Sequence, residues 1–195
     1  MNLTRHAWAA TKALLVLTLL LGVAYPLTVT AVALALPGPA QGSLIRVDSR
    51  VMGSSLLGQA ASDPRWFQAR PSASDQAGDT SGGSNWGPNA PQLAEQVRQR
   101  ENALRAANPD APVGPIPADA LTASASGLDP HISPAYAAWQ APRVAAAWHL
   151  PPGDVEALVA AHTQHPALGF LGTDRVNVTT LNVALAAFGA AHGTR

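Results

Sequence analysis

The segment ALLVLTLLLGVAYPLTVTAVALAL, residues 13–36, contains 24 residues and no charged side chain. As an α-helix, a segment of this length extends about 36 Å, which is enough to cross the ~30 Å hydrocarbon core of a bilayer. The sequence therefore predicts one transmembrane helix over residues 13–36. The helix separates a short amino-terminal tail, residues 1–12, from a larger domain, residues 37–195.

A cleaved signal peptide is the alternative interpretation of this segment. Arg5 and Lys12 would form its basic region, and Ala31-Val32-Ala33 or Ala33-Leu34-Ala35 its cleavage site. The apolar run, however, exceeds the roughly 7 to 15 residues of a signal-peptide core, which favours an uncleaved anchor.

The positive charges on either side of the segment bear on its orientation. Two basic residues precede it and two follow within about 20 residues, so their number alone does not decide. Lys12 directly adjoins the apolar run, whereas Arg46 lies further away on the other side. We therefore expect a single-pass protein of the cell (inner) membrane, with a cytoplasmic amino terminus and an exported domain.

Residues inside the span suggest contact with other helices. Pro26 cannot donate a hydrogen bond to the carbonyl of Gly22, which predicts a kink with a freed carbonyl. Small residues four positions apart allow close helix packing in lipid, although alanine is common throughout this chain. The spaced pairs are Thr18 with Gly22 and Ala31 with Ala35.

The composition excludes several classes of function. Twelve basic residues balance twelve acidic ones, and Lys12 is the only lysine, so no basic surface for nucleic acid is expected. The chain has no cysteine, which excludes disulfides, thiolate metal sites and cysteine nucleophiles.

The domain after the span is predicted to be a compact α+β fold with two polar loops, residues 71–91 and 124–133. A strand followed by a turn at Gly53-Ser54-Ser55 is expected near its start, and a second strand over residues 176–180. Helices are expected from Asn89 as cap with Pro91 in the first turn, from the cap Ser133, from the cap Asp154, and over residues 181–188. The helix after Ser133 is interrupted by Pro142, which predicts either two pieces, residues 135–140 and 143–149, or one kinked helix.

Aromatic residues are predicted to supply the large side chains of the core. The predicted set is Trp66, Phe67, Trp86, Trp139, Trp148, Phe170 and Phe188.

Three groups of residues have the chemical types of functional sites. The glycine-rich run Ser81-Gly82-Gly83-Ser84-Asn85 could present backbone N–H groups to an anion, but it lacks the lysine of a P-loop. Asp129 and His131 with nearby serines have the residue types of a hydrolase, without a G-x-S-x-G elbow. His131, His149, His162 and His165 follow no helical metal-site motif. In each case a structural role is favoured, and no metal site is predicted. Gln140, within a helix, is interpreted as a solvated or core-edge amide.

Several motifs in this order resemble one family, KdpC, the small subunit of the Kdp potassium-transporting ATPase. The motifs are residues 53–59 (GSSLLGQ), 70–73 (RPSA), 81–85 (SGGSN) and 128–134 (LDPHISP). Shorter matches include Gln140, Arg143-Val144-Ala145 and residues 175–178.

The resemblance implies a complex with two main partners, a potassium-translocating channel-like subunit and a P-type subunit that hydrolyses ATP. This chain would then be non-catalytic and hold no cofactor tightly. It would act as a catalytic chaperone that raises the partner's affinity for ATP in a ternary complex. Gln140 and residues Ser81, Gly82, Gly83, Ser84 and Asn85 are implied to take part. Asp129, Pro130, His131, Ser133 and Pro134 are implied to form a partner-contact or structural motif.

The expected orientation places Gln140 and residues 81–85 across the membrane from cytoplasmic ATP. Any effect on nucleotide affinity would therefore be relayed through the membrane helix, with a coupling free energy of about 1 to 3 kcal/mol. The exported domain would cap the potassium entrance. A secreted or anchored hydrolase is the alternative function.

Overall fold

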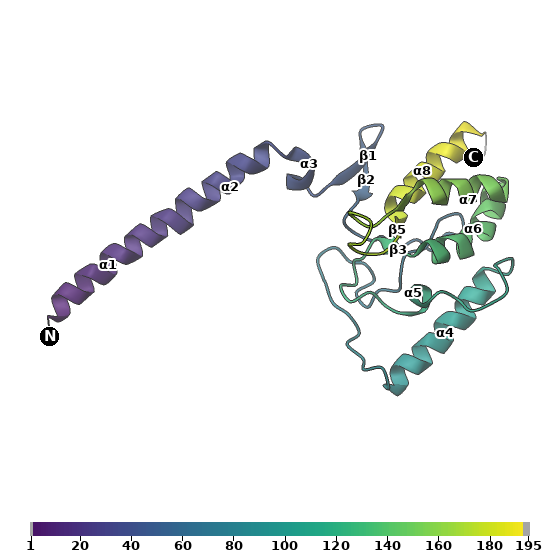
Figure 1. Cartoon of the computed structure of the whole chain (residues 1–195), viewed down its shortest axis with the longest axis horizontal. Coiled ribbons are helices and arrows are strands. Elements are labelled where there is room, and N and C mark those ends of the chain that lie inside the picture. Colours follow the sequence, from purple (N-terminus) through teal and green to yellow (C-terminus); the bar gives the residue numbers. More distant parts are fainter. Residues whose placement is uncertain (1, 193–195) are drawn as a thin grey trace. The chain divides into compact units, whose positions relative to one another are not determined.

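A computed structural model describes residues 2–192 and divides the chain into two compact units (Figure 1). The first unit extends through Ser43, and the second begins at Leu44. Each unit is described by itself.

The first unit is one long helical run. It comprises α1 (Leu3–Leu19), a π-helical turn η1 (Leu20–Ala24) and α2 (Tyr25–Leu34), followed by the short α3 (Pro37–Ala40). The helix thus begins well before residue 13. Its 32 residues are long and apolar enough to span a membrane, and none of its side chains is buried within the chain.

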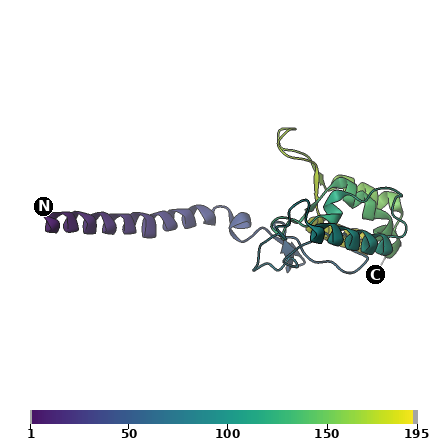
Figure 2. The same cartoon turned by 90° about the horizontal axis from the view of Figure 1, so that it is seen from below.

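Pro26 does not break this helix, and the ribbon continues through it (Figure 2). The turn before it widens into the π-helix instead, which is a common way to absorb a missing backbone donor. The hydroxyl of Thr30 donates to the carbonyl of Pro26 at 2.8 Å, so a side chain satisfies part of the polar backbone here.

The second unit begins with a β-hairpin. Strands β1 (Leu44–Val47) and β2 (Arg50–Ser54) pair antiparallel around Asp48 and Ser49, which both have positive φ. The predicted single strand is therefore wrong, because the chain already reverses at Asp48. Two consecutive residues in the left-handed region make the tight turn that suits a hairpin. A turn does follow β2 near the predicted residues 53–55, where the N–H of Leu57 donates to the carbonyl of Ser54 at 3.4 Å.

Residues 55–90 contain no helix or strand, so the predicted loop 71–91 is confirmed up to Ala90. Helix α4 (Pro91–Ala107) starts at Pro91 as predicted, but its N-cap is Ala90 and not Asn89. Helix α5 (Ala118–Leu121) follows and was not predicted.

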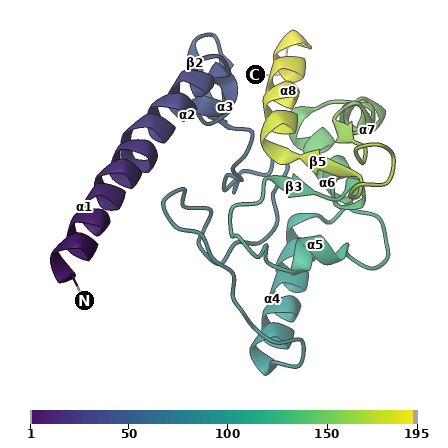
Figure 3. The same ribbon diagram turned by 60° about the vertical axis from the view of Figure 1, so that its left-hand side comes forward.

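The remaining elements surround a small sheet with the strand order β3-β5-β4. Helix α7 contacts both α6 and α8 (Figure 3). The predicted cap Ser133 is confirmed, and Pro142 lies inside a single helix. Asp154 lies in the first turn of α7 and is not its cap. The elements are β3 (His131–Ile132), α6 (Pro134–Trp148), α7 (Pro152–Ala161), β4 (Thr163–Gln164), β5 (Arg175–Asn177) and α8 (Val178–Ala191).

The core forms where α6, α7 and α8 meet β5. Phe67, Trp139 and Trp148 are buried in it, and Trp66 and Phe188 pack against its edge, as predicted. Trp86 and Phe170 are exposed and were assigned to the core wrongly, because each lies in a loop that projects from the core elements.

Candidate functional site

Helix α6 holds segment 64–68, which has no helix or strand, through the side chain of Gln140. The Oε1 atom of Gln140 accepts a hydrogen bond from the backbone N–H of Gln68 at 2.8 Å. Its Nε2 atom donates to the backbone carbonyl of Gln68 at 3.1 Å. The side-chain amide thus bonds both backbone polar groups of one residue, as a neighbouring strand would.

Helix α8 makes the same kind of contact one residue earlier. The Oδ1 atom of Asn182 accepts from the backbone N–H of Phe67 at 2.9 Å, and its Nδ2 atom donates to the carbonyl of Phe67 at 2.9 Å. Because successive residues of an extended chain direct their polar groups to opposite sides, one segment joins two helices. We call this arrangement of Gln140, Asn182 and residues 67–68 the amide clamp.

Arg143 extends the amide clamp into the interior. Its guanidinium donates to Asn108 Oδ1 at 2.6 Å, to the carbonyl of Trp66 at 3.2 Å and to Gln140 Oε1 at 2.9 Å. It also donates to the carbonyl of Pro64. Only 6% of Arg143 is exposed, and burial lowers the pKa of its guanidinium. Four neutral oxygen acceptors replace the water that this cation loses on folding.

The structure places Gln140 deeper than the sequence suggested. Its side chain is 0% exposed and bonded at both ends, so it is not the solvated or core-edge amide that its position in a helix predicted. Sequence reasoning also gave no role to Arg143 or Asn182. The spacing of Gln140 and Arg143, three residues apart on one helix face, was the available signal.

The glycine-rich run 81–85 packs against the second polar loop, which was predicted over residues 124–133 but ends at Pro130, because His131 and Ile132 form β3. The backbone N–H of Gly82 donates to the carbonyl of Ser126 at 2.9 Å, and the hydroxyl of Ser81 donates to the same carbonyl at 3.0 Å. A Cβ atom on Gly83 would lie 3.0 Å from the carbonyl oxygen of Ala125. These contacts use the run to join two loops, and the N–H of Gly82 is already bonded.

The motifs at residues 53–59 and 70–73 contact the same loop. The hydroxyl of Ser72 donates to the carbonyl of Gly127 at 2.7 Å, and the backbone N–H of Gly58 donates to the carbonyl of Leu128 at 2.7 Å. Gly127 has a φ of 71°, and a Cβ atom there would lie 2.7 Å from the carbonyl oxygen of Gly82. Loop 124–133 is therefore the point at which all four sequence motifs converge.

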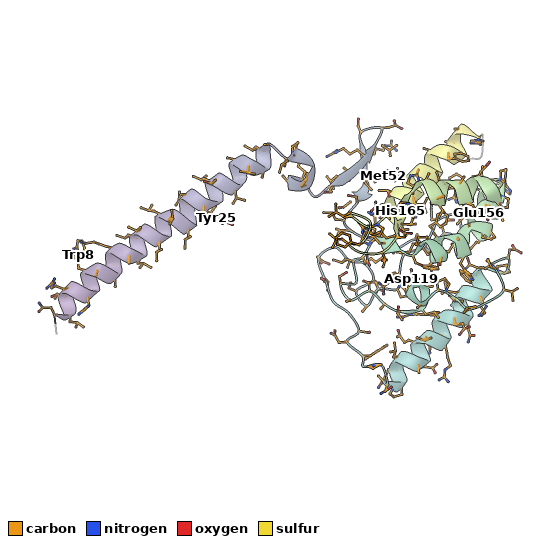
Figure 4. All side chains as sticks on the ribbon, viewed as in Figure 1. Trp8, Tyr25, Met52, Asp119, Glu156 and His165 are labelled. Carbon is orange, nitrogen blue, oxygen red and sulfur yellow. The ribbon has the colours of Figure 1, made fainter. Side chains whose placement is uncertain are left out.

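Asp129 and His131 form the contact that a hydrolase would need, but the serine beside them is used differently. His131 Nδ1 lies 3.2 Å from Asp129 Oδ1. The hydroxyl of Ser133 donates to Asp119 Oδ1 at 3.0 Å and accepts from the N–H of Tyr136 at 3.0 Å. Ser133 is thus a helix cap oriented by a carboxylate (Figure 4 labels Asp119), which favours a structural role.

These residues line a pocket of about 440 Å³ with charges of both signs. Its lining includes the basic Arg70 and Arg175 and the acidic Asp119, Asp129 and Asp174. Arg70 Nη1 approaches Asp129 Oδ2 at 3.7 Å. Within residues 2–192, no three His, Asp or Glu side chains gather closely enough to hold a metal ion.

Comparison with known proteins gives consistent matches over nearly the whole chain. The family model described as "KdpC: K+-transporting ATPase, c chain" matches residues 7–187. A protein of Sorangium cellulosum, named potassium-transporting ATPase KdpC subunit, is 54% identical over 92% of this chain and 96% of its own length.

Proteins with the same name from two other organisms are similarly close. That of Dechloromonas aromatica is 51% identical over 90% of this chain and 94% of its own length. That of Variovorax paradoxus is 54% identical over 90% of this chain and 92% of its own length. The motifs that converge on loop 124–133 and the match over residues 7–187 lead to one conclusion: this chain belongs to the KdpC family.

Proposed function

We propose that this chain is a non-catalytic accessory subunit of an ATP-driven potassium uptake complex. The helix Leu3–Leu34 anchors it in the cell membrane. The observation that carries the proposal is a 32-residue apolar helix with no buried side chain, attached to a domain of the KdpC family. Such a helix needs lipid or other membrane helices to cover it. The partners are a P-type subunit that hydrolyses ATP and a potassium-translocating subunit.

The domain from Leu44 onward is proposed to lie outside the cytoplasm and to cap the potassium entrance. The chain has no cysteine, so one introduced cysteine gives an unambiguous label. Val113→Cys places the label at a fully exposed position of the domain, and Asn2→Cys places it before the helix. In intact cells, an impermeant thiol reagent should label the first variant and not the second. The opposite pattern would contradict the proposed orientation.

Capping itself is tested by removing residues 44–195 while keeping the helical unit. We expect weaker assembly and a lower apparent affinity for potassium. If both stay normal, the domain does not cap the entrance.

The chain is further proposed to raise the ATP affinity of its partner by coupling through the membrane helix. The support is the burial of Gln140, whose side chain is 0% exposed and bonds Gln68 and Arg143, so that it does not reach a nucleotide directly. Gln140 then acts by holding α6 and segment 67–68 in one arrangement, and residues 81–85 act by holding two loops together. Coupling between distant sites amounts to about 1 to 3 kcal/mol, or roughly 5- to 150-fold in affinity.

The purified complex carrying Gln140→Ala tests this relay. We expect the complex to assemble and the apparent KM for ATP to rise within that range. Gln92→Ala, which changes an exposed glutamine on α4, is the matched control and should leave KM unchanged. An assembled Gln140→Ala complex with normal KM for ATP would contradict the role of the amide clamp in coupling.

A further inference from the structure

The connection between β4 and β5 projects from the domain as a narrow arm. Residues 165–174, which we call the β4–β5 arm, form the yellow-green segment that stands away from the other elements in Figure 2. All residues from Ala167 to Arg175 are exposed. The arm therefore contributes little to the core of its own domain.

The tip of the arm has three large apolar side chains that are exposed to solvent. Leu168 is 82% exposed, Phe170 71% and Leu171 54%. Single exposed apolar residues are ordinary, but three large ones within four positions form a patch of the kind that marks an interaction site. The turn that displays them has Leu168 at a φ of 55°, a region that leucine rarely adopts.

The arm is held in shape at its base and along its length. At the base, His165 Nδ1 lies 2.8 Å from Asp174 Oδ1, and Arg175 Nε donates to Gln164 Oε1 at 3.2 Å. Nearer the tip, Ala167 and Leu171 form an antiparallel bridge. A preorganised arm loses less conformational entropy when it binds than a flexible loop would.

The distribution of charge identifies the kind of surface that the arm fits. Residues 166–173 contain no charged side chain. At the base, Asp174 lies beside His165, while Arg175, which follows the arm, bonds the neutral side chain of Gln164. Segments that insert into anionic lipid surfaces usually add unpaired Lys or Arg for the headgroups, and the arm offers none. An uncharged apolar tip on an arm that contains no Lys or Arg is complementary to an apolar cleft in a protein.

We propose that the tip of the β4–β5 arm docks into an uncharged apolar cleft on another subunit of the potassium-transporting ATPase. This inference rests on the proposed function, which supplies the partner. Leu168, Phe170 and Leu171 enter the cleft, and the ladder between Gln164 and Arg175 sets the direction in which they point.

Site-specific crosslinking in membranes that contain the whole complex tests the inference. A photoreactive p-benzoylphenylalanine replaces Phe170 in one variant and Val113, a fully exposed residue outside the arm, in the control. We expect position 170 to crosslink to another ATPase subunit and position 113 to give no such product. Crosslinks from position 170 only to lipid, or only to a second copy of this chain, would overturn the proposal.

Substitution of the tip gives an independent measurement. Phe170→Ser combined with Leu171→Ser should lower the retention of the other subunits at limiting concentration at least about tenfold, since burial of one such side chain contributes more than that factor. Val113→Ser should have no effect. Circular dichroism and the melting temperature of the purified chain should stay unchanged, because the arm lies outside the core. Retention equal to that of the unsubstituted chain would contradict docking.

The failure of this inference is distinguishable from that of the proposed function. If the other subunits co-purify with every variant while position 170 crosslinks only lipid, the arm proposal is wrong and the accessory role stands. If the unsubstituted chain co-purifies with no ATPase subunit, both the accessory role and the arm proposal are wrong.

Discussion

Two helical regions of this chain contain an internal proline, and they accommodate it in different ways. In the helix Leu3–Leu34, the turn before Pro26 widens into a π-helix. Helix α6 in the domain remains a single α-helix through Pro142. The first helix buries none of its side chains in the chain, whereas α6 buries nine.

Packing explains the difference. Pro142 removes the donor that would bond the carbonyl of Ala138, but Gln140 and Arg143 tie the same turn to segment 64–68 and to Asn108. The surrounding contacts thus impose the helical path. The first helix has no such contacts within its own chain, so its backbone makes the local adjustment by widening into the π-helical turn. Matched substitutions in the two helices test whether packing is the cause of the difference.

The largest difference in stability is expected between substitutions of Arg143 in α6 and of Lys12 in the first helix. Arg143→Ala leaves Asn108 Oδ1, Gln140 Oε1 and the carbonyl of Trp66 short of a charged donor inside the core. We expect the free energy of unfolding of the detergent-solubilised chain to fall by roughly 3 to 5 kcal/mol. Lys12→Ala removes an exposed cation and should leave the domain's unfolding transition unchanged. Equal effects of the two substitutions would show that α6 does not depend on its buried polar contacts.

Tyr136 should make α6 sensitive to alkali. Burial raises the pKa of its hydroxyl to about 12. The unfolded chain releases this proton near pH 10, before the folded chain does, so the stabilisation is complete below pH 10 and is lost as the pH rises toward 12. The loss amounts to about 2 to 3 kcal/mol.

Urea titrations between pH 9 and pH 12 measure this effect. Tyr136→Phe should flatten the pH dependence of unfolding, and Tyr25→Phe in the exposed helix should not. An unchanged alkaline slope in the Tyr136→Phe variant would assign the pH dependence to another group.

Replacing the proline in α6 by alanine is expected to change the stability of the domain by a smaller amount. Pro142→Ala restores a donor for the carbonyl of Ala138 within a helix that is already formed. We expect the domain to gain about 1 to 2 kcal/mol of stability, less than the ~3 kcal/mol of an exposed helix because packing has absorbed part of the cost. Pro26→Ala should leave thermal unfolding of the domain unchanged. A loss of stability on Pro142→Ala would mean that the proline ring itself is a packing contact.

The smallest change in the free energy of unfolding is expected when the N-cap residues of the two helices are replaced. Ser133 caps α6 through its hydroxyl, whereas Asn2, the N-cap of α1, makes no side-chain cap bond. Ser133→Ala should cost about 1 kcal/mol in the free energy of unfolding, and Asn2→Ala close to nothing. Ser133→Thr, which keeps the hydroxyl, should recover most of the loss. Without such recovery, the effect of Ser133→Ala would not be due to capping.

The features that could be predicted from the sequence are those set by neighbouring residues. The apolar run predicted the helix that could span a membrane, and Ser133 before Pro134 predicted the cap of α6. The polar composition of residues 71–90 correctly indicated a long connection without helix or strand. Each of these depends on spacing within one turn or one segment.

The features that could not be predicted depend on contacts between distant segments. Phe170 is as apolar as Phe67, and only the fold places the first on an arm and the second in the core. Asn89 has the chemistry of a cap, but α4 takes Ala90 instead. The burial of Gln140 follows from segment 64–68, about seventy residues earlier in the chain. Local patterns contain no information about such partners.

The amide clamp also constrains which positions can change during evolution. Across the contact with residues 67–68, Gln140 and Asn182 bond only main-chain atoms, so these hydrogen bonds do not depend on the side chains found there. The side-chain partner of Gln140, Arg143, lies on the same helix. Position 68, whose side chain is only half-buried, is free to vary, while a substitution of either clamp amide has no compensating change available across the contact. Relatives should therefore keep both amides without any co-varying residue opposite them, and methods that detect contacts from correlated substitutions would miss this junction.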